Sequence, residues 1–262
     1  MKRLSILMYH GLYATEAQRL AIDPIDRPYA LSTETFARQL DLLAAAHIPV
    51  IPPHALEQPG ALIPGGVLLT FDDGHASNAE LALPLLKQRG LSALFFVTTD
   101  FIGQRAGFCT WDQVRQLAQQ GMVVGGHGHT HRFLSDLDSN SVFAELQNCK
   151  DTLETQLQCE IRHMSFPGGR YSLEAINLAK NYGYKYLYSS DFESLEIDNV
   201  EKYRVLPRMA IRANINDLIF LKYAKSKKTT ILKESIICNT KKTIKSLIGN
   251  GTYNNIYDLF RK

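Results

Sequence analysis

The chain has 262 residues, of which 45% are hydrophobic and 21% are charged, and its formal net charge is +3. This composition excludes an intrinsically disordered chain, and the absence of any apolar run of roughly 18 residues argues against a membrane-spanning segment. The length suits one large α/β domain or two small ones.

The first segment, Met1–Gly11, has two basic residues followed by a short apolar run that ends at His10. A secretory signal needs an apolar core of about 7–15 residues and a cleavage site with small residues. We therefore interpret this segment as a first buried strand and predict a cytoplasmic protein.

Short apolar runs then alternate with amphipathic segments along the chain. We expect strands at Leu4–Tyr9, Val67–Phe71, Ala93–Val97, Met122–Gly125, His163–Phe166 and Lys185–Tyr188. We expect helices at Thr33–Ala46, Asn78–Arg89, Trp111–Gln120, Asp138–Leu157 and Ser172–Tyr182. Several of these helices end beside a glycine, a common stop signal. Such alternation predicts a mainly parallel sheet, either open or closed into a barrel.

Three other segments interrupt or end this alternation. Leu12–Leu31 is expected to be a loop or excursion, because Asp23-Pro24 and Arg27-Pro28 break regular structure. Four prolines in Ile51–Gly66 predict a segment that wraps the surface. After about Asn214 the alternation fades into an amphipathic helix.

The end of the chain is basic. From Lys222 to Lys262 the charge is +8, so the first 221 residues carry −5 of the total of +3. Such a tail can bind anionic lipid, an anionic polymer or another subunit, or it can be the solvated face of a terminal helix. The cysteines show no metal-binding spacing, and we expect free thiols: Cys109, Cys149, Cys159 and Cys238.

Glycine, histidine and aspartate gather where the predicted strands end. The strand ends are MYHG, TFDDGH, VVGGHGHTH and SFPGGR. Parallel α/β folds place their chemistry at the carboxyl ends of strands, so these four segments are expected to meet at one site.

The segment HGHTH places His127, His129 and His131 within five residues. Imidazole is a common Zn²⁺ ligand, and a catalytic zinc site uses three protein ligands and keeps one open position. Two histidines and one aspartate would suffice. If one carboxylate of Asp72-Asp73 binds a cation, its neighbour can stay ionised and act as a base. The alternative is an Asx-turn at the Asp-Gly sequence.

Thr70–Gly74 (TFDDG) and the His-x-x-x-His of His127–His131 resemble the first two motifs of the polysaccharide deacetylases, the NodB-homology domain of carbohydrate esterase family 4. Ser165–Ser172 (SFPGGRYS) is similar to the third motif, whose centre is aromatic-Pro-x-Gly. The resemblance covers roughly Leu4 to Ile211. It implies a distorted (β/α) barrel and metal-dependent removal of an acetyl group from an N-acetylated sugar.

The resemblance also implies residue roles. Asp73, His127 and His131 would bind the metal, by default Zn²⁺, although Co²⁺ or Ni²⁺ could replace it. Asp72 would be the general base, and the backbone N–H of Gly168 would help to hold the oxyanion. Such a reaction needs polarisation of the carbonyl, stabilisation of the oxyanion and protonation of the leaving amine.

The sequence departs from the family pattern in three places. No histidine follows His163 to serve as the late acid, the fourth motif has only a vague counterpart, and Ser165 stands where an arginine is common. The first strand end, LMYHG, resembles the exopolysaccharide branch of the family, which implies that His10 is the general acid. His75 and His129 compete for that role. Arg208 is a candidate to hold Asp72 from a late strand, and a surface position is its alternative.

The remaining residues of interest have structural alternatives. Tyr171 and Trp111 are expected to stack on sugar or, more simply, to pack in the fold. His47, His54 and His163 have no partner pattern and are treated as structural.

Three functions remain open at this stage. The first is a metal-dependent deacetylase of a surface polysaccharide or its precursor. The others are a deacylase of an O-acetyl ester or non-sugar amide, and a glycan-binding pseudoenzyme. We predict a catalytic domain at 1–213 and a basic helical extension at 214–262. We expect no nucleic-acid partner, and contact of the tail with a membrane or a glycosyltransferase.

Overall fold

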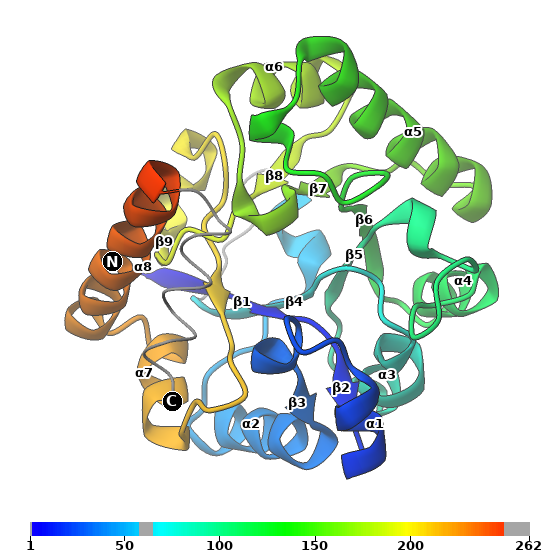
Figure 1. Cartoon of the computed structure of the whole chain (residues 1–262). Coiled ribbons are helices and arrows are strands. Elements are labelled where there is room, and N and C mark those ends of the chain that lie inside the picture. The colour runs from blue at the N-terminus through cyan, green and yellow to red at the C-terminus, as the bar shows by residue number, and fades with distance from the viewer. Residues whose placement is uncertain (1, 58–64, 249–262) are drawn as a thin grey trace.

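The computed structural model describes residues 2–57 and 65–248. Among these residues, eight strands form one curled sheet in the order β10-β1-β4-β5-β6-β7-β8, with β9 paired to β1 (Figure 1). The strands of this sheet are β1 (Arg3–Tyr9), β4 (Gly66–Phe71), β5 (Leu94–Val97), β6 (Val123–Gly126), β7 (His163–Ser165), β8 (Tyr186–Tyr188), β9 (Leu195–Glu196) and β10 (Met209–Ala210). All pairs except β1–β9 are parallel.

Helices surround the curled sheet (Figure 1). They are α2 (Thr33–Ala45), α3 (Leu83–Gln88), α4 (Trp111–Gln119), α5 (Ser139–Leu157) and α6 (Leu173–Asn181). Side-chain oxygens of Ser32, Thr110, Asp138 and Ser172 cap the first turns of α2, α4, α5 and α6. The distorted (β/α) barrel expected from the sequence is confirmed, and each of the six expected strands ends within one residue of its prediction.

The strands are buried on both faces. Leu7, Leu69 and Phe95 pack with the surrounding helices in the larger core cluster. Their neighbours Ile6, Leu68 and Phe96 belong to a second cluster on the inner face of the sheet. Near-continuous apolar runs are typical of parallel strands covered on both sides, which explains why the strand positions follow from the sequence.

Two expected segments differ from the structure. Leu12–Leu31, expected as a loop or excursion, contains β2 (Leu12–Tyr13), α1 (Glu16–Ala21), the turn η1 (Arg27–Tyr29) and the first residue of β3 (Leu31–Ser32). The helix expected at Asn78–Arg89 begins as the π-helical turn η3 (Asn78–Ala82) before α3. In the proline-rich stretch, η2 (Pro53–Glu57) precedes residues 58–64, which lie outside the described residues.

The segment Leu206–Ile211 lies between the last strand of the barrel and the first. Leu206 forms a parallel bridge with Tyr188, and the N–H of Ile211 donates to the Met8 carbonyl at 2.9 Å. This connection carries Arg208 to the inner face of the sheet. It follows η7 (Ile197–Lys202), and β10 forms within it, as the prediction of a late strand around Arg208 requires.

The chain continues through α7 (Asp217–Ala224) and α8 (Lys228–Ile248). Phe220 and Tyr223 of α7 are buried in the core, and the Ser5 hydroxyl donates to the Tyr223 carbonyl at 2.7 Å. The helix expected near the C-terminus corresponds to α8. Within residues 2–57 and 65–248, no helix has the length and hydropathy needed to cross a bilayer. The boundary between a catalytic domain at 1–213 and a C-terminal extension at 214–262 stays a prediction.

Candidate metal centre and active site

The strand ends that carry histidine and aspartate meet at one end of the barrel. The Asp72 N–H, just after β4, donates to the Tyr9 carbonyl at 2.9 Å, so His10 and Asp72 leave adjacent strands side by side. The His127 N–H, just after β6, donates to the Val97 carbonyl at 2.9 Å. Because parallel strands end at the same edge, the four segments form a single site.

Asp73, His127 and His131 form a group of side chains that could hold a metal ion. Their ligand atoms all lie within 4.8 Å of one another. The Asp73 Oδ1 atom is 3.3 Å from Nε2 of His127 and 3.3 Å from Nε2 of His131. The Nδ1 of His127 donates to the Ser165 carbonyl at 2.8 Å, so Nε2 carries the lone pair that is free to bind a metal. One carboxylate and two imidazoles fit a divalent cation such as Zn²⁺.

Two of these three residues adopt a backbone conformation that non-glycine residues rarely take. Asp73 has φ of 75° and His131 has φ of 64°. Burial alone would raise the pKa of Asp73, but contacts with His127 and His131 outweigh it and hold the pKa well below its usual range. Burial lowers the pKa of His131, but the Asp73 carboxylate more than compensates and raises it. Backbone strain of this kind is typical of functional sites.

Glu145, on α5, holds the segment between the two histidines. Its Oε2 accepts hydrogen bonds from the backbone N–H groups of His129 and Thr130, at 2.8 and 2.9 Å. Its Oε1 accepts a further bond from the Thr130 hydroxyl. No motif in the sequence points to Glu145 as a residue of the site. A signal is nevertheless present, because Glu145 lies on the apolar face of α5 beside Val142 and Leu146, where an acidic residue is unusual.

Arg208 binds Asp72 through both of its terminal nitrogens. The two bonds to the carboxylate oxygens are 2.6 and 2.7 Å long, and a further bond reaches the Ser165 hydroxyl at 2.6 Å. Arg208 is 0% exposed and Asp72 is 2% exposed. The alternative of a surface arginine is therefore wrong. Burial alone would raise the pKa of Asp72, but Arg208 and His127 outweigh burial, so the pKa lies below its usual range.

His10 lies beside these carboxylates. Its Nδ1 atom is buried and has no hydrogen-bond partner among the described residues, and its ring lies 5.0 Å from the ring of Tyr29. Burial lowers the pKa of His10, against the opposing effect of Asp73 and Asp72. The lowered pKa makes protonated His10 a better proton donor than an ordinary imidazolium.

The two competing histidines have different surroundings. The Nε2 of His75 lies 3.4 Å from Oδ2 of Asp73, and its ring stacks on Phe108 at 4.7 Å. His129 instead pairs through Nδ1 with the Thr99 hydroxyl at 2.8 Å. His75 is thus in contact with the candidate metal centre, whereas His129 supports the loop.

Gly168, Tyr171 and Trp111 lie farther along the predicted motifs. Gly168 has φ of 61°, and a Cβ atom there would lie 2.6 Å from the Phe133 ring. Tyr171 stacks on Phe166 and donates to Asp191 at 3.0 Å, and burial raises its pKa to about 12. Trp111 packs against the core at the start of α4. Both aromatic side chains therefore contribute to packing.

Among the described side chains, Cys109, Cys149 and Cys159 carry free thiols. The side chain of Cys238 lies outside the described residues. His163 is buried and hydrogen-bonded to Tyr188 and Glu57, which confirms a structural role in the barrel.

Comparisons with known proteins show similarity to polysaccharide deacetylases. The family model described as polysaccharide deacetylase matches residues 62–187. YxkH, a Bacillus subtilis protein whose name assigns it to the polysaccharide deacetylases, is 31% identical over 119 residues, 45% of this chain and 42% of YxkH. A chitin deacetylase of Colletotrichum lindemuthianum is 30% identical over 88 residues, 34% of this chain and 36% of that protein. The chain thus matches less than half of the length of these curated relatives.

Solved structures share the fold over most of the chain. A Streptococcus pyogenes deacetylase, PplD, superposes with a TM-score of 0.73 and 22% identity, over 85% of this chain and 98% of that one. IcaB from Ammonifex degensii superposes with a TM-score of 0.69 and 22% identity, over 86% and 97%. At this identity the likeness concerns the fold alone.

Proposed function

We propose that this chain, which belongs to the polysaccharide deacetylase family, is a metal-dependent hydrolase that removes an acetyl group from an N-acetylated sugar of a surface polysaccharide or its precursor. One observation carries the proposal. The three ligand atoms of Asp73, His127 and His131 meet beside a second buried carboxylate, Asp72, that is held ionised by Arg208. A divalent cation and an adjacent base together can catalyse amide hydrolysis at neutral pH.

Asp73, His127 and His131 would hold the cation, with Zn²⁺ as the default and Co²⁺ or Ni²⁺ as substitutes. When bound, the cation supplies Lewis acidity, which polarises a carbonyl and makes water easier to deprotonate. Glu145 fixes the loop between the two histidines, and the Ser165 carbonyl fixes the tautomer of His127. The protein therefore orients these ligands before substrate arrives.

Asp72 acts as the general base and takes a proton from the attacking water. Arg208 holds both of its oxygens, so the carboxylate stays ionised and keeps one orientation. The water oxygen bonds to the acyl carbon, and the backbone N–H of Gly168 donates to the negatively charged carbonyl oxygen. His10, in its protonated form, delivers a proton to the leaving nitrogen and the carbon–nitrogen bond breaks, which yields acetate and a free amine. The proton taken up by Asp72 then restores the proton that His10 has lost.

The release of acetate tests this proposal. Protein loaded with Zn²⁺ should release acetate from N-acetylglucosamine oligomers, and removal of the cation by a chelator should stop it. His10→Ala should lower kcat by about 100-fold or more while the protein keeps its metal. A fully loaded wild type that releases no acetate from any acetylated sugar would favour the glycan-binding pseudoenzyme instead.

The type of bond that is cleaved needs a separate test. Asp72, Asp73 and the histidines act on the acetyl group, so they do not determine whether the leaving group is a sugar amine, a sugar hydroxyl or a non-sugar amine. O-acetyl sugars and N-acetyl amides without a sugar, measured beside N-acetyl sugars, separate these alternatives. We expect the highest kcat/KM for the N-acetyl sugar.

We also propose that α8 docks the protein on an anionic membrane surface. Its described part exposes Leu232 (63%) and Ile236 (58%) beside Lys233, the arrangement of an interfacial amphipathic helix. Vesicles with anionic lipid should carry the protein in a flotation assay, and neutral vesicles should not. The double variant Leu232→Gln, Ile236→Gln should lose binding. Equal flotation of the variant and wild type would contradict the proposal that α8 docks on a membrane. Contact of α8 with a glycosyltransferase would then be the alternative to test.

A further inference from the structure

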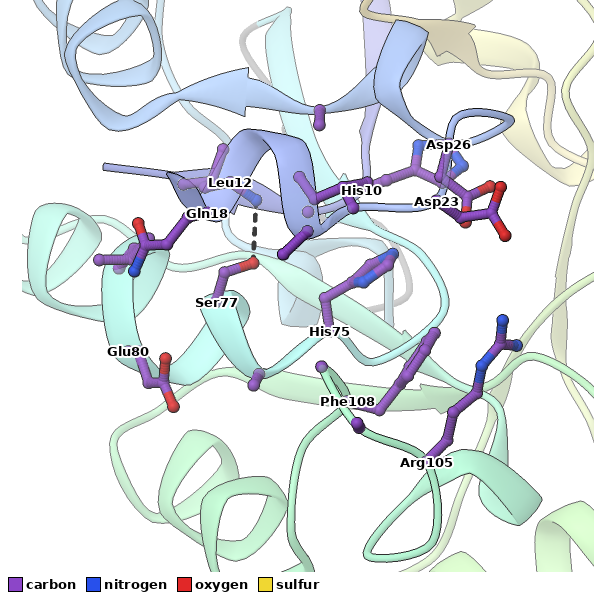
Figure 2. A pocket seen from close by; sticks show the side chains of 18 residues that line it. His10, Leu12, Gln18, Asp23, Asp26, His75, Ser77, Glu80, Arg105 and Phe108 are labelled. Atoms are coloured by element: carbon purple, nitrogen blue, oxygen red, sulfur yellow. Dashed lines mark hydrogen bonds between the residues drawn. The ribbon is translucent and has the colours of Figure 1, made fainter. Parts of the chain in front are cut away.

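A cavity of about 440 Å³ opens directly beside the candidate active site (Figure 2). One wall is the segment from His10 to Ala30, which includes α1. The opposite walls are the turn from His75 to Leu81 and the loop from Arg105 to Phe108. His10 and His75 belong both to the cavity and to the site, so a ligand in the cavity would adjoin the reacting group. The volume lies in the range of pockets that hold small ligands.

The charged side chains of the cavity are mostly acidic. Asp23, Asp26 and Glu80 line it, against Arg105 as the lining residue with a permanent positive charge. Figure 2 shows Asp23 and Asp26 together on the wall that carries His10, with Arg105 on the loop that carries Phe108. This lining has a net charge of −2 with the histidines neutral.

The three carboxylates of the cavity differ in their partners. Asp23 accepts a hydrogen bond from the Ile25 N–H at 2.9 Å, and Glu80 accepts one from Gln113 at 3.0 Å. Asp26 is half-buried and has no side-chain hydrogen bond or ion pair within the described ranges. Burial and the nearby Asp73 charge raise its pKa, as expected for a carboxylate that lacks a cation. The buried Nδ1 of His10, in the same cavity, is a second group without a partner among the described residues.

Aromatic stacking is not available to a ligand here. The Phe108 ring is covered by His75 at 4.7 Å and by the Arg105 guanidinium at 5.0 Å. Beside apolar contacts with residues such as Leu12 and Ile22, recognition in the cavity therefore relies on charge and hydrogen bonds. The ligand that satisfies both is a polar group with hydroxyls and a positive charge.

We propose that this cavity binds the sugar unit next to the one being deacetylated, and that Asp26, with Asp23, selects a unit that carries a free ammonium group. This inference rests on the proposed function, because the reaction itself produces such units. A chain deacetylated once presents an ammonium beside its remaining acetyl groups. The cavity would thus make the enzyme act preferentially on partly deacetylated polymer.

The ratio of two specificity constants tests the proposal. Wild type is assayed on a fully acetylated N-acetylglucosamine trimer and on trimers with one free amine. We expect kcat/KM to be about tenfold higher with a free amine next to the reacting unit, as for one hydrogen bond to a charged group. Asp26→Asn should reduce this ratio to about one, and Glu80→Gln should reduce it less. Asp151→Asn, which removes an exposed charge on α5, should leave the ratio unchanged.

A binding measurement separates this inference from the proposed function. Calorimetry with the glucosamine trimer and Zn²⁺-loaded protein should give a Kd that rises about tenfold in Asp26→Asn and that weakens with salt. If this binding is found but no acetylated sugar is hydrolysed, the cavity assignment stands and the deacetylase fails. A wild type that hydrolyses both trimers equally, or a ratio unchanged in Asp26→Asn, overturns the cavity assignment alone. A preference for acidic sugars that is lost in Arg105→Gln would also overturn it.

Discussion

Asp72 and Asp73 are adjacent and buried because each carboxylate has its own set of partners. Arg208 neutralises Asp72, and the two histidines surround Asp73. The carboxylates are thus assigned to different tasks by their neighbours, in the way that environment separates paired acids in many active sites. The Arg208 contact also explains Ser165, whose small side chain leaves room for the guanidinium and bonds to it.

Removal of Arg208 should be severely destabilising. Arg208→Met leaves the Asp72 charge buried without a cation, so we expect a loss of about 3–5 kcal/mol in the free energy of unfolding. Arg208→Lys keeps the positive charge but loses the bidentate contact with Asp72. Its free energy of unfolding should lie between those of Arg208→Met and wild type. Urea denaturation monitored by circular dichroism provides the measurement. A loss below about 1 kcal/mol in Arg208→Met would show that Asp72 finds another partner.

Glu145 should control metal affinity without touching the metal. Glu145→Gln weakens the bonds to His129 and Thr130, so the metal Kd should rise about 10- to 100-fold. Asp151→Asn on the same helix is the matched control and should bind metal as wild type does. Competition with a chromogenic chelator measures both. Equal affinity in the three proteins would mean that the loop is held by other contacts.

The residues of the site differ in the type of element that carries them. Asp73 and His127 lie within two residues of a strand end, and His131 is four residues after His127, so their spacing in the sequence predicts that they meet. Glu145 reaches the site from a helix, and Asp26 from an excursion with no periodic pattern. Their proximity depends on tertiary packing, which a local pattern does not encode.

Among the elements, the turn after β7 is tightly constrained at Gly168. Gly168→Ala forces a side chain into a left-handed backbone and against the Phe133 ring. We expect a loss of about 2–4 kcal/mol, which combines backbone strain with overpacking. Gly121 has φ of +84°, and a Cβ atom added there would meet nothing within 4 Å. Gly121→Ala therefore isolates the backbone cost, about 1 kcal/mol. Thermal unfolding of both variants compares them, and equal losses would argue against a clash at Gly168.

Helix α1 shows why the sequence pattern predicts a loop in this excursion. None of its six residues is buried, so it has no apolar stripe to give a helical period. The signal that is present is a capping box, in which Thr15 and Gln18 bond to each other's backbone. By contrast α4 and α6 bury one face, and their limits differ from the prediction by one residue.

At the scale of the whole molecule, alternation of strands and helices is sufficient to predict the barrel. The path of Leu206–Ile211 between β8 and β1 is not predictable in the same way, because its contacts with β1 join residues about 200 positions apart. Arg208 can be proposed from the sequence only because a late strand is expected there. The side of the sheet on which its guanidinium lies is a property of the closed fold.

Contacts of Glu57 at the amino ends of the strands should make the free energy of unfolding depend on pH in the acidic range. There Glu57 accepts hydrogen bonds from His163 and Arg162, and these contacts, His163 foremost, lower its pKa to about 2. A folded pKa below the unfolded value of about 4.5 gives a stabilisation that is present above pH 4.5 and is lost as the pH falls toward 2. Glu57→Gln should therefore lower the free energy of unfolding at pH 7. The difference in the free energy of unfolding between pH 7 and pH 3 should be smaller in this variant than in wild type. Urea unfolding at the two pH values measures this, and an unchanged difference would contradict it.

The central claim is that Asp73, His127 and His131 bind a divalent metal beside an ionised Asp72. The most direct test is the metal content per chain of wild type, Asp73→Asn and Asp72→Asn, purified without chelator and then loaded with Zn²⁺. Asparagine tolerates the left-handed backbone at position 73, so the variant should stay folded. We predict about one ion per chain in wild type and in Asp72→Asn, and loss of the ion in Asp73→Asn. A wild type that holds no Zn²⁺, Co²⁺ or Ni²⁺ after loading would contradict the account.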